Sequence, residues 1–275
     1  MKKIIISIVV CFMMLAGICS SAFSETIEGP GYSSSIEAAF AYGEFFSRGD
    51  IEGMLSTFSV ESYVENYNTE FSIELRNYNF PLLLTQSFQL PDESQYLHQL
   101  NILKRQSDII SILVQQCIIL ANGHDSIGSN IKNKEQYEIY KSNFHNRSWP
   151  GDGKQSDIIA YNAEDFFTAA GNADLYKEFL AYKEKLNYDE RNLPRYGCDE
   201  FDFMIVFGTI NEDFFMQFLT GARYGDRWYI LDARADLLET FLGLDPMTGE
   251  GLYSLFDIAY ATDWTFAAIT DYLKR

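Results

Sequence analysis

Histidine, cysteine and basic residues are scarce in this chain of 275 residues. It contains 3 His, 4 Cys and 6 Pro, and its 21 Lys and Arg stand against 39 Asp and Glu, which gives a formal net charge of −18. Phosphate binding requires clustered Lys and Arg, so this balance argues against nucleic acid or an anionic membrane surface as the main partner. Four cysteines are also too few for a disulfide scaffold of this length.

Recognisable catalytic and metal-binding motifs are lacking as well. The histidines His98, His124 and His145 form no His-x-x-x-His pattern, and the sequence contains no Cys-x-x-Cys, Gly-x-Ser-x-Gly or P-loop motif. We therefore predict no metal and no cofactor, and we favour a non-catalytic protein over an enzyme.

Apolar residues, in contrast, are abundant. The chain is 47% hydrophobic and 16% aromatic, with 22 Phe and 18 Tyr. A disordered chain has far fewer such residues, so the composition predicts a globular protein with a sizeable core.

The first residues have the pattern of an export signal. Lys2 and Lys3 precede an apolar run over 4–15, and Ala22-Phe23-Ser24 fits the small-x-small rule for signal peptidase. The run is short for a retained membrane anchor, and Ile18 before Cys19 makes a poor lipoprotein site. We predict cleavage near Ser24, a secreted, cell-surface or periplasmic location, and no transmembrane span in the mature chain. Loss of the two lysines leaves 19 bases against 39 acids, a charge of −20.

Two cysteines, Cys117 and Cys198, remain after this cleavage. An oxidising compartment permits a disulfide between them, and closing so long a loop would contribute about 4 kcal/mol in the chain-entropy model. The alternative is two free thiols, because Cys117 lies in an apolar run where a cysteine packs as a small hydrophobe.

Charge divides the mature chain into unequal blocks. Residues 25–70 carry −8 and residues 199–275 carry −9, whereas residues 71–150 are neutral. The neutral block is also rich in helical patterns. We therefore predict a single α+β domain over 25–275 that contains a large helical insertion at about 71–198.

Helical periodicity with start and stop signals covers most of the first two thirds. Ser34 to Glu37 is a capping box, Gly49 suits a helix C-terminus, and Asp50 can cap a second helix. The second half of the long helix predicted over 96–121 is apolar nearly all round, so we expect it to be buried. The predicted helices cover 35–48, 51–58, 96–121, 132–144, 163–170 and 173–186.

Near residue 200 the apolar period changes from 3.6 to 2, which is typical of strands. It predicts strands over 201–207, 214–224 and 227–232, with Gly225-Asp226 as a hairpin turn, and then helices over 235–242 and from Tyr253. The predicted fold class is α+β, with the N-terminal helices and the helical insertion packed on a C-terminal antiparallel sheet.

Two segments carry a family resemblance: AYGEFFSRGDIEGMLSTF (Ala41–Phe58) and ARYGDRWYILD (Ala222–Asp232). They resemble uncharacterised exported bacterial proteins and the cone-shaped α+β domains of the nuclear-transport-factor-2-like superfamily, over about 30 residues. The resemblance implies N-terminal helices across a strongly curved antiparallel sheet, often with a pocket.

Five residues are candidates for binding a ligand. Tyr63, Tyr67 and Trp228 could line a carbohydrate or lipid pocket, although most aromatic residues belong to the core. Asp202 points away from the neighbouring phenylalanines of its strand, and Gln217 lies on one face of the next strand.

Three functions follow as hypotheses. The first is a non-catalytic module that binds a small apolar ligand or a partner protein. The second is an acid/base enzyme that uses Asp202 with Tyr63, because a desolvated carboxylate can serve as a base near neutral pH. The third is an interaction protein that docks a partner on the neutral helical block, which an exposed apolar patch on 97–120 would support.

Overall fold

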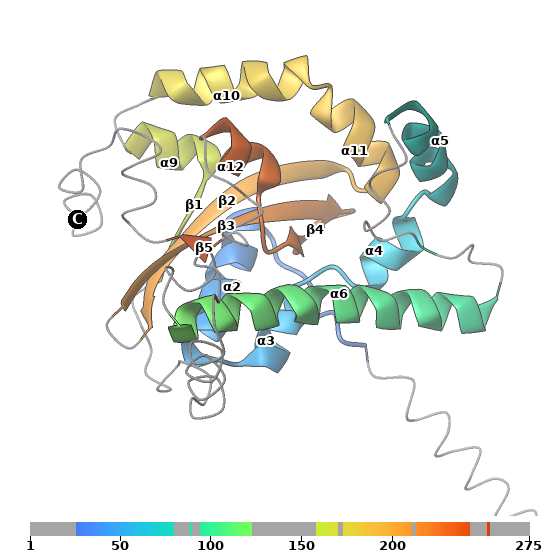
Figure 1. The fold of residues 1–275 in the computed structure, drawn as a ribbon, viewed down its shortest axis with the longest axis horizontal. Helices are drawn as coiled ribbons and strands as arrows, with labels where there is room; N and C mark the ends of the chain where they lie inside the picture. The colour runs from blue at the N-terminus through green and yellow to red at the C-terminus, as the bar shows by residue number, and fades with distance from the viewer. Residues whose placement is uncertain are drawn as a thin grey trace, which may run out of the picture.

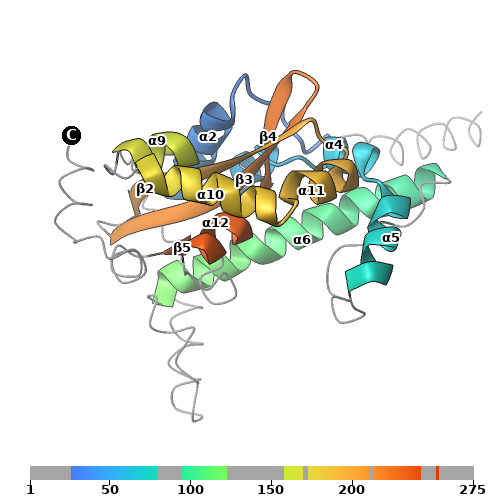
Figure 2. The ribbon, with the colours of Figure 1, turned by 90° about the horizontal axis from the view of Figure 1, so that it is seen from above.

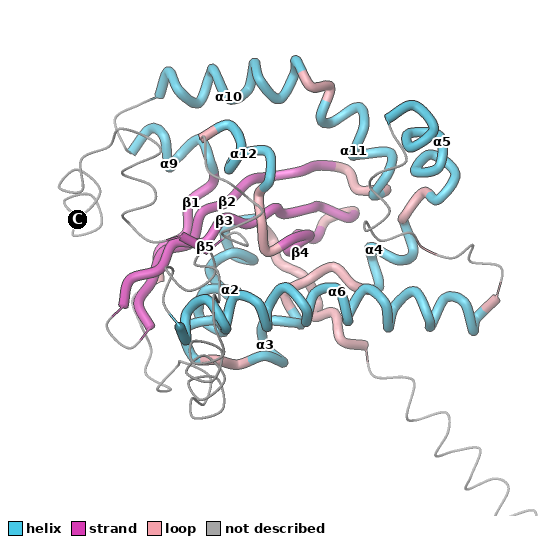
Figure 3. Tube along the Cα trace, in the orientation of Figure 1, coloured by secondary structure: helices cyan, strands magenta, loops and turns pink. Residues whose placement is uncertain are grey.

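The computed structural model confirms the α+β class: an antiparallel sheet lies between two groups of helices (Figures 1 and 3). The predicted signal peptide and the predicted helix over 132–144 lie outside the described residues, as does the tail beyond Tyr253. The structure describes residues 26–79, 89, 94–122, 158–169, 173–210, 213–242 and 252–253.

The sheet is antiparallel throughout, in the order β1-β2-β3-β4, and β5 pairs with β3 beyond the end of β4. The three predicted strands are confirmed as β2, β3 and β4. The predicted helix start at Tyr253 is wrong, because Tyr253 pairs with Met216 as part of β5. The strands are β1 (Ile159–Asn162), β2 (Glu200–Ile210), β3 (Asp213–Tyr224), β4 (Arg227–Asp232) and β5 (Leu252–Tyr253).

Alternation along β2 explains why both faces of the sheet are covered. Phe203 and Phe207 belong to one buried cluster, while Met204 and Val206 between them belong to another on the opposite face. Side chains in a strand point to alternate faces, and here both sets are apolar. Each face therefore needs its own layer of helices.

The first face is covered by α2 (Ser35–Arg48), α3 (Ile51–Ser56) and α6 (Gln95–Asn122). The predicted caps are confirmed. The Ser34 hydroxyl accepts from the amide of Glu37, Gly49 has a φ of 70°, and the Asp50 carboxylate accepts from the amide of Gly53.

The second face is covered by α9 (Ala163–Ala169), α10 (Ala173–Lys185), α11 (Tyr188–Tyr196) and α12 (Asp236–Phe241). Figure 2 shows α10 and α11 lying across the strands. Neither α11 nor β1 was predicted from the sequence. β1 lies inside the predicted helical insertion and pairs with β2, so this part of the insertion completes the sheet.

A third cluster lies at one end of the sheet, where α4 (Glu61–Asn66) and α5 (Thr69–Asn79) meet α11. The amide of Asn68 donates to the carbonyl of Arg195 at 2.9 Å, which joins the α4–α5 corner to α11. Tyr63, Phe201 and Leu231 are buried in this cluster.

The N-terminal segment 27–34 is held against the body by hydrogen bonds at both of its ends. The two carboxylate oxygens of Glu61 accept from the amides of Ile27 and Glu28, each at 3.1 Å. The Glu28 carboxylate in turn accepts from the amides of Val60 and Ser62 and from the Ser62 hydroxyl. Further along, Tyr32 and Trp228 of β4 exchange two backbone hydrogen bonds, each amide donating to the carbonyl of the other residue.

Candidate functional site

Tyr63 and Tyr67 pack against each other and against Tyr196 of α11, with ring centroids 5.3 to 6.3 Å apart. Tyr63 and Tyr67 are buried. Burial raises the pKa of the Tyr63 hydroxyl, although Arg105 opposes this shift. The two predicted ligand-binding tyrosines therefore make a packed aromatic contact between α4 and α11.

Arg105 of α6 completes this aromatic cluster. Its guanidinium lies 4.3 Å from the ring centre of Tyr63, a cation–π geometry. The Nε atom donates to the carbonyl of Ser59 at 3.1 Å, and Nη2 donates to the carbonyl of Leu231 at 2.5 Å. This one side chain thus connects α6 to the segment between α3 and α4 and to strand β4.

Asp202 lies at the opposite side of β2 from the phenylalanines, as predicted. Its Oδ2 accepts from the Ser35 hydroxyl at 2.5 Å, and its Oδ1 accepts from the amide of Phe203 at 2.9 Å. Burial raises the pKa of this carboxyl, and the hydrogen bond from Ser35 counteracts part of the rise. Tyr63 makes its contacts in the aromatic cluster with Arg105, so the structure does not bring together the pair proposed for the enzyme hypothesis.

Gln217 of β3 is fully buried between the sheet and α2. Its amide nitrogen donates to the Tyr42 hydroxyl at 3.0 Å and lies 3.3 Å from the carbonyl of Ala233. Gln116 of α6 accepts from the same hydroxyl at 3.1 Å and donates to the same carbonyl at 3.0 Å. The Gln217 carbonyl oxygen has no hydrogen-bond partner. These polar groups fix α2 and α6 on the sheet and lie away from the surface.

Trp228 is half-buried on β4, where its backbone pairs with Tyr32. The five predicted ligand residues therefore lie in separate places. Tyr63 and Tyr67 are in the aromatic cluster. Asp202 lies on β2 and contacts the start of α2, Gln217 is in the core, and Trp228 pairs with the N-terminal segment. The structure does not gather them into one pocket.

Cys198 is a buried free thiol in the aromatic cluster, so the bridge to Cys117 is not formed in this structure. Burial raises the pKa of the thiol to about 12. A thiol with so high a pKa is almost wholly protonated at neutral pH and is a poor nucleophile.

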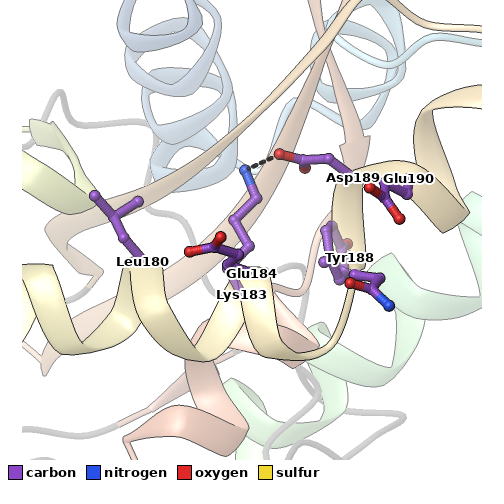
Figure 4. A pocket seen from close by; sticks show the side chains of 7 residues that line it. Leu180, Lys183, Glu184, Tyr188, Asp189 and Glu190 are labelled. Atoms are coloured by element: carbon purple, nitrogen blue, oxygen red, sulfur yellow. Dashed lines mark ion pairs between the residues drawn. The ribbon is translucent and has the colours of Figure 1, made fainter.

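A groove of about 250 Å³ lies at the corner where α10 turns into α11 (Figure 4). Asn187 occupies the corner with a φ of 49°, a left-handed conformation that Asn tolerates better than most residues. Lys183 reaches across the groove to Asp189, with 2.9 Å between Nζ and Oδ2. The groove is lined by Leu180, Lys183, Glu184, Asn187, Tyr188, Asp189 and Glu190.

Acidic side chains dominate this groove. Glu184, Asp189 and Glu190 outnumber Lys183, whose charge is already paired. Such a surface suits a basic side chain or an amine better than an anion. In the part of the chain that the structure describes, no group of three His, Cys, Asp or Glu residues could hold a metal ion.

The long helix α6 has a second apolar side that faces away from the core. Its inner residues Ile109 and Leu113 are buried against the sheet layer. We define the outer face of α6 as Tyr96, Leu100, Leu103, Ser107, Ile110 and Val114. Four of these are large and exposed: Tyr96 by 68%, Leu103 by 50%, Ile110 by 41% and Val114 by 42%.

This exposure corrects one prediction. The second half of the helix was expected to be buried on all sides, but Ile110 and Val114 are exposed. Apolar periodicity shows that a helix has a core-facing side, and it does not show how much apolar surface the neighbouring elements leave uncovered. The exposed residues do provide the apolar patch that the third hypothesis requires.

No family model, curated protein or solved structure matches this sequence. Among the described residues, no helix is both long enough and apolar enough to cross a membrane. Within the described residues, the outer face of α6 and the α10–α11 groove are the surface features on which the proposal below rests.

Proposed function

We propose that this protein is an exported, non-catalytic binding module that recognises a protein partner through the outer face of α6. The observation that carries the proposal is the exposure of Tyr96, Leu103, Ile110 and Val114 on one helix. Contiguous exposed apolar residues of this kind are typical of interaction surfaces.

The way α6 is held supports this proposal. Arg105 and Gln116 bond the inner side of the helix to backbone carbonyls of Ser59, Leu231 and Ala233. A docking surface gains affinity when it is ordered before the partner arrives, since less conformational entropy is then lost on binding. The outer face thus belongs to a helix whose position is already fixed.

The enzyme hypothesis has less support. Both oxygens of Asp202 accept hydrogen bonds from Ser35 and Phe203, and its proposed partner Tyr63 contacts Arg105 instead. The resemblance to nuclear-transport-factor-2-like domains stays a prediction, and a small-ligand site remains an alternative at the α10–α11 groove.

Site-specific photo-cross-linking tests the proposal. A photo-reactive amino acid replaces Leu103 in the chain expressed and exported by its own host, and covalent adducts are analysed by mass spectrometry. We expect a discrete protein adduct at this position, because a docked partner excludes water from the side chain.

Leu180 provides the matched control. It is 43% exposed on α10, on the other side of the sheet from α6, and it borders the groove. The same replacement there should give no such protein adduct. If position 103 gives no protein adduct, or if both positions give the same set of adducts, the proposed function is wrong.

A further inference from the structure

The outer face of α6 has the spacing of a coiled-coil seam. Its residues follow one another at intervals of four, three, four, three and four, from Tyr96 through Ser107 to Val114. This alternation is the a/d pattern of a heptad repeat, in which Tyr96, Leu103 and Ile110 take d positions and Leu100, Ser107 and Val114 take a positions. The seam is about 27 Å long at 1.5 Å per residue.

A heptad seam requires a second helix with a matching seam. The inner side of α6 already packs on the core through Ile109 and Leu113, so the seam is additional to the contacts within the chain. A second copy of the chain has the same seam on its own α6. In a dimer with a two-fold axis, the two seams would face each other.

This face is where charge opposes a second copy least. The predicted mature chain carries −20, so two copies repel each other over most of their surfaces. Beside the seam, Lys104 and Asp108 form an ion pair with each other at 2.8 Å, and the other flanking residues Gln99, Gln106 and Ser111 are uncharged. Two copies can therefore approach here without bringing unpaired like charges together.

Building on the proposed function, we propose that the partner is a second copy of this chain, paired through antiparallel α6 helices. In this register Tyr96 packs on Val114 of the second copy, Leu100 on Ile110, and Leu103 on Ser107. The Tyr96–Val114 and Leu103–Ser107 layers then each combine a larger side chain with a smaller one, and the Leu100–Ile110 layer pairs two aliphatic side chains of equal size. A parallel pair would instead place Tyr96 on Tyr96 and leave a void at Ser107, and the helix dipoles would oppose it.

A single pair of helices buries less than the roughly 800 Å² per partner of a standard interface, so the dimer is weak and reversible. Its remaining electrostatic cost is the repulsion between two acidic bodies, which salt screens. The dissociation constant should therefore fall as ionic strength rises, the reverse of an interface built on ion pairs.

Sedimentation velocity of the purified mature chain tests the assembly over a micromolar concentration series. The wild type should show a monomer–dimer equilibrium, and the double variant Leu103→Glu, Ile110→Glu should weaken it by about tenfold or more. The control Leu180→Glu adds a charge at an equally exposed leucine on α10 and should leave the equilibrium unchanged. Thermal unfolding of each monomer verifies that the variants fold.

Thiol cross-linking tests the register in a chain without Cys117. Leu100→Cys mixed with Ile110→Cys should give a cross-linked dimer with a short bifunctional reagent, whereas either variant alone should not. Efficient cross-linking of Leu100→Cys with itself would mean a parallel pair and would overturn the register.

The outcomes separate this inference from the proposed function. A wild type that is monomeric at every concentration, or a dimer that the α6 double variant does not weaken, overturns the second copy as partner. If Leu103 is nevertheless photo-cross-linked to a different protein, the proposed function stands without it. If Leu103 captures nothing, both are wrong.

Discussion

Arg105 holds three parts of the molecule together through one guanidinium group. It stacks on Tyr63 and donates to the carbonyls of Ser59 and Leu231. Even partial burial of a cation is costly unless its hydrogen bonds are satisfied, and half-buried Arg105 meets two carbonyl oxygens and an aromatic face. The side chain also fixes α6, which presents the outer face from its other side.

Arg105→Met should lower the free energy of unfolding by about 2–4 kcal/mol, because it leaves the carbonyls of Ser59 and Leu231 without their donors. The control is Lys104→Met on the next residue, whose ion pair with Asp108 is exposed. This control should change stability by less than about 1 kcal/mol. Urea unfolding of both variants measures the difference, and equal losses would contradict the role given to Arg105.

Asp202 makes the stability of the protein depend on pH in a defined direction. Burial raises the pKa of its carboxyl above the ordinary value of 3.8, so the folded state holds the proton more tightly than the unfolded chain. The carboxyl therefore contributes stability below its unfolded pKa, and this contribution is lost as pH rises through the folded pKa.

Asp202→Asn removes this titration. Relative to the wild type, the variant should gain stability as pH rises from acid to neutral, while the shared carboxyls Glu28 and Asp236, whose pKa values burial also raises, cancel in the comparison. Urea unfolding across that pH range measures the difference. A difference that is constant with pH would show that Asp202 does not titrate abnormally.

At the scale of elements, two glycines in left-handed conformations have very different surroundings. Gly197 ends α11 with a φ of 61°, and a Cβ built there would lie 2.0 Å from the carbonyl oxygen of Asn66. Gly225 in the β3–β4 turn has a φ of 63°, and nothing lies within 4 Å of its Cβ position. The backbone conformation is thus alike at the two sites, but only Gly225 has room for a methyl group.

Gly225→Ala should cost only the left-handed strain, about 1 kcal/mol. Gly197→Ala should cost at least twice as much, since the backbone of Asn66 or α11 must move as well. Thermal unfolding of the two variants compares them directly. Similar losses would mean that the α4–α11 junction yields to a methyl group without strain.

Local sequence signals predicted those elements whose ends are fixed by their own residues. Ser34, Gly49 and Asp50 determine where α2 and α3 begin and end, and the Gly225-Asp226 turn determines the β3–β4 hairpin. α11 escaped prediction because it is short, polar and contains Pro194. β1 was not predicted because its four residues carry no strand signal of their own, and only their pairing with β2 distinguishes them from the start of α9.

The candidate site was less predictable than the fold, because the exposure of a side chain depends on residues that are distant in the sequence. Tyr63 and Trp228 were proposed because aromatic side chains can line a carbohydrate or lipid pocket, but their exposure depends on α11, Arg105 and the N-terminal segment that pack on them. The outer face of α6 is visible in the sequence as a heptad. Only the structure shows that the core uses the opposite side of the helix.

At the scale of the whole molecule, the rate at which a reagent labels the Cys198 thiol measures how often the fold opens. It is buried where α4, α11 and β2 meet, with a pKa of about 12. In a Cys117→Ser chain, we expect a thiol reagent to label Cys198 slowly under native conditions and rapidly in denaturant. Mass spectrometry follows the labelling. Rapid native labelling would contradict the burial, and a wild-type chain without free thiols would restore the bridge to Cys117.

The N-terminal segment brings an early part of the chain into contact with a late one. Glu28 and Tyr32 lie just after the predicted cleavage site near Ser24, so under the proposed export they would cross the membrane long before Trp228, to which Tyr32 is paired. A chain that is exported in order cannot complete this pairing until nearly all of it has crossed. Under the proposed export, the pairing of Tyr32 with Trp228 would therefore be one of the last contacts to form, and the N-terminal segment would join the sheet only after the body of the protein had been delivered.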